Sequence, residues 1–260
     1  MGAVLPALPL LLLLLLALAA TAELAVVGSS PPPPPAADEI VTHQVLLTEA
    51  AKTRGAVALD GTPAMYYIKN ATSEASRHKY HVYLEGGGWC TGTVSCARRA
   101  LTVLGSSSPK YHDKTLSLPS GCRCDGGGYF SSSPARNPLM HDWNQVFVNY
   151  LDGGSFSGNQ SVPDSNGTGA PKIYYRGRRI LDAVLDSLLT TQGMGAATDV
   201  VLSGCSAGGQ AIYLQADYVA TRLPPGASSA KQSAKRTRPH ARTHAPAESP
   251  ERRVDSSQRP

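Results

Sequence analysis

The first 222 residues of the chain lack any excess of one charge. The 260 residues contain 24 Lys and Arg against 19 Asp and Glu, a formal net charge of +5. Residues 223–260 account for all of that excess, with eight basic and three acidic residues, so the rest of the chain carries 16 of each sign. The overall basic charge therefore says nothing about the main part of the chain, and we expect no nucleic-acid partner.

Zinc-ligand spacing is also missing. Cys122-Arg-Cys124 is too closely spaced for a usual zinc knuckle, and no Cys/His pair follows it at ligand spacing. We therefore expect no metal ion. The chain has five cysteines, and an odd number leaves at least one without an intramolecular partner. Which cysteines pair is left open by the sequence.

Residues 223–260 lack aromatic side chains, and Leu223 and Val254 are their only large aliphatic residues. Such a segment cannot bury enough apolar surface to offset the entropy lost on ordering. We predict a disordered basic tail over 223–260, with a basic interaction tail as the alternative.

The N-terminal segment lacks Lys and Arg but holds a continuous apolar run from Leu10 to Ala20. The run ends in the small residues Ala20-Thr21-Ala22. The apolar run and these small residues together predict a secretory signal peptide over residues 1–22. A retained membrane anchor is the alternative, disfavoured by Pro6 and Pro9. After cleavage we expect no membrane association, and residues 23–39 form a Pro-rich linker.

Export would place the cysteines in an oxidising compartment, where disulfides form. It would also expose three Asn-x-Ser/Thr sequons to glycosylation, at Asn70, Asn159 and Asn166. We expect a secreted, extracellular glycoprotein.

Residues 40–222 alternate between apolar strand-like and amphipathic helix-like segments. His81–Leu84, Val146–Val148 and Asp199–Ser203 have the composition of strands, and residues 174–191 carry apolar side chains at helical spacing. This alternation predicts an α/β sandwich with a mostly parallel sheet. Residues 105–133 are rich in Ser, Gly and Cys and predict a long loop.

Ser206 lies in Gly204-Cys-Ser-Ala-Gly-Gly209, between an apolar strand-like segment and a helix-like stretch over 210–222. Strand, Gly-x-Ser-x-Gly and helix in that order predict a nucleophile elbow, which presents the serine hydroxyl on a strained turn. The backbone N–H of Ala207 would be one oxyanion donor, and Gly86-Gly-Gly88, directly after an early strand, would supply others. An ordinary tight loop is the alternative interpretation of the three glycines.

Four segments follow one another in an order typical of one family: Tyr83–Cys90, Asp152–Gly158, Tyr175–Ile180 and Gly204–Gly209. In these segments the chain closely resembles the plant pectin acetylesterases, whose wider relatives include Notum-type carboxylesterases. The resemblance covers about residues 40–222 and implies an α/β-hydrolase fold and a secreted cell-wall enzyme that removes acetyl groups from pectin. It implies Ser206 as nucleophile, Gly87, Gly88 and Ala207 as oxyanion donors, no cofactor, and acetylated pectin as the partner of a monomer. Trp89 would then line the acyl pocket.

The acid and the histidine of the catalytic triad are missing from the pattern. In the family both follow the serine, whereas here only the low-complexity segment follows it, and His240 and His244 lack a strand to position them. His141-Asp142 precedes the serine and is interpreted as a loop or helix-cap feature, and His81 as a packed strand residue. We therefore expect an incomplete α/β-hydrolase domain without its C-terminal strands, in a truncated and catalytically impaired form. A non-catalytic pectin-binding glycoprotein and a lipid-directed carboxylesterase are the alternatives.

Overall fold

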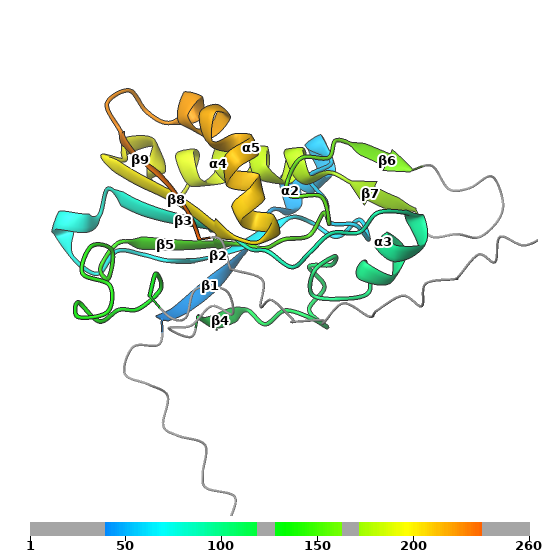
Figure 1. Cartoon of the computed structure of the whole chain (residues 1–260), viewed down its shortest axis with the longest axis horizontal. Coiled ribbons are helices and arrows are strands. Elements are labelled where there is room, and N and C mark those ends of the chain that lie inside the picture. The colour runs from blue at the N-terminus through cyan, green and yellow to red at the C-terminus, as the bar shows by residue number, and fades with distance from the viewer. Residues whose placement is uncertain (1–39, 119–127, 163–171, 236–260) are drawn as a thin grey trace, which may run out of the picture. The chain divides into compact units, whose positions relative to one another are not determined.

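A seven-stranded sheet runs through the centre of the computed structural model (Figure 1). The structure describes residues 40–118, 128–162 and 172–235, which belong to one compact unit beginning at residue 39. The predicted signal peptide, the linker over 23–39 and Asn166 lie outside the described residues.

The strand order across the sheet is β4-β1-β2-β5-β3-β8-β9. The parallel half contains β5 (Asn144–Val148), β3 (Lys79–Leu84), β8 (Asp199–Cys205) and β9 (Ser228–Lys235). The antiparallel half adds β2 (Met65–Lys69), β1 (Ile40–Leu46) and β4 (Thr115–Leu118). Parallel pairing at the centre and helices packed on the sheet confirm the predicted α/β class.

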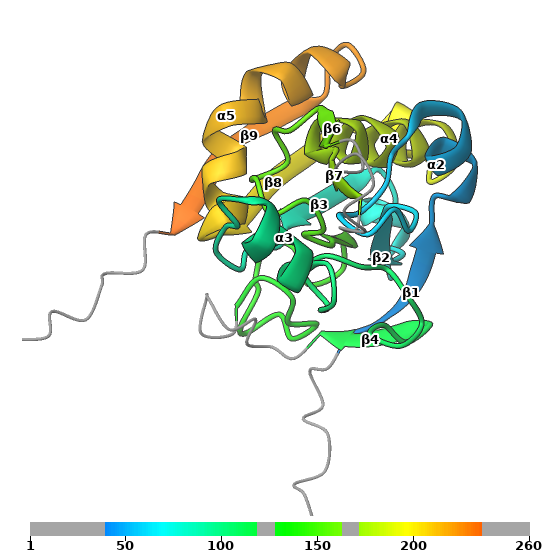
Figure 2. The same cartoon turned by 90° about the vertical axis from the view of Figure 1, so that its right-hand side faces the viewer.

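The central strands are buried on both faces, as expected when a parallel sheet is covered on both sides. On one face, α4 (Gly177–Thr190) and α5 (Ala207–Arg222) pack on the sheet (Figure 2). Apolar residues of α4 recur at helical spacing and are buried there, including Ile180, Val184 and Leu188. On the other face, Phe130 contacts the rings of Tyr83 and Phe147, so residues beyond β4 cover that side.

Smaller elements surround the sheet. They are α2 (Thr48–Arg54), the 3₁₀ turns η1 (Glu74–Ser76) and η2 (Met194–Ala196), α3 (Thr93–Arg99), and the two-stranded pair of β6 (Gln160–Val162) and β7 (Ile173–Tyr175). None of the helices in the described ranges is long and apolar enough to cross a membrane.

Two strands occur where the sequence predicts irregular structure. Strand β9 lies within the predicted disordered tail and pairs in parallel with β8, and β4 lies within the predicted loop over 105–133 and pairs with β1. The physical reason is that an exposed sheet edge offers backbone N–H and C=O groups that any extended segment can pair with, whatever its side chains. Residues 236–260 of the predicted tail lie outside the described residues.

Candidate active site

Ser206 occupies the turn between β8 and α5. Strand β8 ends at Cys205 and α5 begins at Ala207, so a single residue reverses the chain. Ser206 has φ 53° and ψ −119°, a region that residues with a Cβ rarely adopt and that costs about 1–3 kcal/mol. Its side chain is exposed to solvent. The strand-turn-helix geometry is that of a nucleophile elbow.

Glycines allow the backbones of β3, β8 and α5 to approach closely beneath this turn. A Cβ added to Gly208 would lie 2.0 Å from the Leu84 carbonyl oxygen, and one added to Gly204 would lie 2.7 Å from the backbone of Gly208. Only glycine fits at either position. The first turn of α5 is therefore packed directly against β3, which fixes the height at which Ser206 stands above the sheet.

The glycine-rich segment after β3 lies against the elbow. A Cβ added to Gly86 would lie 2.1 Å from the Cys205 carbonyl oxygen and 3.2 Å from the Ser206 Cβ. The contact follows from topology, because β3 and β8 are neighbouring parallel strands with Leu84 opposite Gly204, so their carboxyl ends meet at one edge. The structure thus brings together Ser206, Ala207 and the segment with Gly87 and Gly88.

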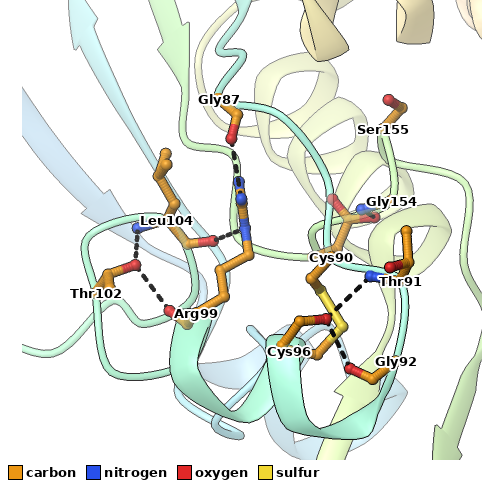
Figure 3. Close-up of a disulfide and its surroundings, with 12 residues drawn as sticks. Gly87, Cys90, Thr91, Gly92, Cys96, Arg99, Thr102, Leu104, Gly154 and Ser155 are labelled. Carbon is orange, nitrogen blue, oxygen red and sulfur yellow. Dashed lines mark hydrogen bonds between the residues drawn. A yellow bond between two sulfur atoms is a disulfide. The ribbon is translucent and has the colours of Figure 1, made fainter.

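A disulfide fastens the end of this segment, which we call the oxyanion loop (Gly86–Cys90). Cys90 is bonded to Cys96 in α3, with the two Cα atoms 5.1 Å apart (Figure 3). The Cys90 N–H also donates to the Gly153 carbonyl at 3.2 Å. Cys205, beside the nucleophile, is disulfide-bonded as well. Export to an oxidising compartment, which the sequence predicts, is compatible with these bonds.

Trp89 is 55% exposed beside the loop glycines. Its indole N–H donates to the Ser155 hydroxyl at 2.8 Å, and that hydroxyl donates to Gln210 Oε1 at 3.3 Å. Gln210 lies in the first turn of α5, so Ser155 couples the ring of Trp89 to the nucleophile helix. Sequence reasoning gives Ser155 no role, although it lies in one of the four family-like segments.

Two carboxyl groups lie inside the protein next to the loop. Burial raises the pKa of Glu85 to about 7, although the Tyr150 N–H and the Arg99 cation oppose that shift. Burial likewise raises the pKa of Asp152 to about 6 against the N–H groups of Phe156 and Gly154 and the same Arg99. Neither acid stands out in the sequence, because their burial depends on tertiary packing.

No histidine of the described residues is hydrogen-bonded to Ser206. His81 lies wholly inside the sheet, where its ring nitrogens interact with Gln145 and Ser203, and burial lowers its pKa to about 4. His141 Nδ1 pairs with the Asn137 carbonyl, and Asp142 accepts from Ser73 and Ser76. His81 is thus a packed strand residue, and His141-Asp142 belongs to a loop network, as interpreted from the sequence.

The described residues hold no group of three or more His, Cys, Asp or Glu side chains arranged to bind a metal ion. Asn70 and Asn159 are exposed, and Asn159 Oδ1 accepts from Arg179 at 2.6 Å. Their glycosylation stays a prediction.

A nucleophile elbow after one parallel strand, facing a glycine loop after its neighbour, defines an α/β-hydrolase-like fold. The chain belongs to the pectinacetylesterase family, whose model matches residues 36–233. It is 40% identical to pectin acetylesterase 5 of Arabidopsis thaliana over 182 residues, 70% of this chain and 39% of that protein. It is 32% identical to the palmitoleoyl-protein carboxylesterase NOTUM of Homo sapiens over 164 residues, 63% of this chain and 30% of that protein. The chain thus spans about two-fifths of the length of the plant relatives.

Proposed function

We propose that the chain is a secreted serine carboxylesterase acting on acetyl esters of pectin in the plant cell wall. The observation that carries the proposal is the contact between the strained, exposed Ser206 and the oxyanion loop. A serine in this position is suited to chemistry that develops negative charge on a carbonyl oxygen. Membership of the pectinacetylesterase family supports the substrate class.

In the proposed reaction, Ser206 Oγ attacks the acetyl carbonyl, and the carbonyl oxygen gains negative charge. The N–H of Ala207 and those of Gly87 and Gly88 stabilise this oxyanion. The tetrahedral intermediate collapses, and the sugar oxygen leaves as a hydroxyl with the proton that the Ser206 hydroxyl gave up. Water then hydrolyses the acetyl-enzyme to acetate and returns a proton to the serine oxygen. No metal or cofactor takes part in these steps.

In this proposal Ser206 is the nucleophile and the N–H groups of Ala207, Gly87 and Gly88 are the oxyanion donors, whereas no histidine of the described residues is hydrogen-bonded to Ser206. We therefore propose a catalytically impaired site. Where a triad base is lost, the oxyanion hole and substrate binding alone still give a rate about a thousandfold to ten-thousandfold above the uncatalysed reaction. A residual rate of that size is what we expect from this chain.

The test uses the full chain and its Ser206→Ala variant. We expect slow, Ser206-dependent phosphonylation by a fluorophosphonate and slow release of acetate from acetylated pectin, both lost in S206A. Absence of Ser206-dependent labelling would overturn the esterase proposal and favour a non-catalytic pectin-binding protein. Faster cleavage of long-chain acyl esters than of acetyl esters would favour a lipid-directed enzyme. Turnover above about 1 s⁻¹ would contradict impairment.

A further inference from the structure

Arg99, the last residue of α3, contacts the backbone of the oxyanion loop. Its Nη1 donates to the Gly87 carbonyl at 2.9 Å, and its Nε donates to the Leu104 carbonyl at 3.0 Å (Figure 3). One planar guanidinium thus bridges two carbonyl groups. Such a fork fixes the direction of the groups it binds better than a single ammonium does.

The guanidinium is itself held in place from several sides. It lies over the Tyr150 ring, 4.8 Å from the centroid, and the buried carboxyls of Asp152 and Glu85 attract it. The Cys90–Cys96 disulfide joins α3 to the loop, so helix and loop cannot drift apart. These contacts therefore fix the position of the Arg99 guanidinium that binds the Gly87 carbonyl.

The loop lies between Arg99 and the nucleophile elbow. A Cβ on Gly86 would meet Cys205 and Ser206, whereas a Cβ on Gly87 would meet Leu104 at 2.7 Å and Arg99 Nη2 at 3.5 Å. In a planar trans peptide, the carbonyl of one residue and the N–H of the next point in opposite directions. With the Gly87 carbonyl bound to Arg99, the Gly88 N–H is turned away from α3.

We propose that Arg99 is a positioning residue that aims the Gly88 N–H at the oxyanion formed on Ser206. Gly87 and Gly88 have positive φ, 149° and 69°, so without a fixed carbonyl the peptide between them could rotate readily. This inference rests on the proposed function. It assigns Arg99 a role in stabilising the transition state. Arg99 exerts this role through the Gly87–Gly88 peptide and does not itself contact the substrate.

The experiment measures fluorophosphonate labelling of Ser206 in the full chain, recording the rate constant and the final labelled fraction separately. The fraction counts correctly folded sites, and the rate constant reports how well each site stabilises the developing charge. For Arg99→Leu we expect a rate constant about 10- to 100-fold lower at an unchanged final fraction, since misdirecting a donor costs less than the 100- to 1000-fold cost of removing one. Arg99→Lys keeps the positive charge but loses the planar guanidinium. Its labelling rate constant should lie between those of the unmodified chain and R99L.

Arg98→Leu is the matched control, because Arg98 precedes Arg99 in α3, is exposed, and donates no side-chain hydrogen bond within the described part of the chain. Its rate should match the unmodified chain. Equal rates for R99L and R98L would overturn the inference alone, whereas absence of labelling in the unmodified chain would overturn the proposed function and the inference with it. If R99L fails to fold, R99K decides: an unchanged rate rejects the role, and a reduced rate at full final fraction supports it.

Discussion

Three residues other than glycine have positive φ within the described ranges: Ser155, Phe156 and Ser206. All three lie at the site, and the surrounding contacts explain why each is tolerated. The Ser155 N–H donates to the Tyr150 hydroxyl at 3.0 Å and the Phe156 N–H donates to Asp152 at 3.2 Å, so both strained peptides have buried partners. Ser206 is held by the packing of β8 and α5. Backbone strain is concentrated where side chains must be aimed.

Replacing Ser206 by glycine should stabilise the fold while removing its chemistry. Glycine adopts the conformation of Ser206 without strain, and the relief exceeds the entropy that glycine loses on folding. We expect the free energy of unfolding, measured by urea denaturation, to be about 1 kcal/mol higher for S206G than for S206A. S206A is the control, since alanine keeps the Cβ and the strain. Equal stability of the two variants would show that the turn is not strained.

At the scale of elements, the sequence predicts the helices and turns that depend on neighbouring residues. It does not predict the strands that form only by pairing with another strand. The elbow follows from adjacent residues, Gly204 to Gly209, and α4 follows from its apolar periodicity, so both appear where the sequence puts them. Strand β9 has no apolar side chain larger than alanine and forms by pairing with β8. Strand β4 is only four residues long, too short for its two leucines to indicate a strand, and it pairs with β1, far away in the chain. Likewise, Arg99 and Glu85 gain their significance only from tertiary contacts.

The close approach of α5 to β3 gives a prediction about these two elements. In Gly208→Ala the new Cβ would lie 2.0 Å from the Leu84 carbonyl oxygen, so helix and strand must separate. We expect a loss of about 3 kcal/mol or more in the free energy of unfolding, and loss of Ser206 labelling. Gly92→Ala is the control, because a Cβ there meets nothing within 4 Å. A G208A variant as stable as G92A would contradict the packing described.

At the scale of the whole molecule, stability should depend on pH through the two buried acids. Glu85 has its pKa raised from 4.5 to about 7, and Asp152 from 3.8 to about 6. Between the ordinary and the raised pKa, the folded chain keeps a proton that the unfolded chain has released. Each acid therefore contributes its full stability below the ordinary pKa, and loses it as the pH rises through the raised one.

We expect the free energy of unfolding to be higher at about pH 5 than at about pH 8, with Glu85 alone responsible for about 3 kcal/mol. Denaturant titrations across this pH range measure the slope of the free energy of unfolding against pH. Glu85→Gln, which can still accept from the Tyr150 N–H, should flatten it. A slope of opposite sign, or one that E85Q leaves unchanged, would show that Glu85 is not the group responsible.

The pairing of β3 with β8 has a practical consequence. The oxyanion loop and Ser206 come from segments far apart in the chain and meet only when these strands lie side by side in the register observed. A molecule with a slipped register would display the serine without the loop. The reactivity of this one hydroxyl is therefore a gauge of correct assembly, and covalent tagging would report the share of native molecules in any preparation.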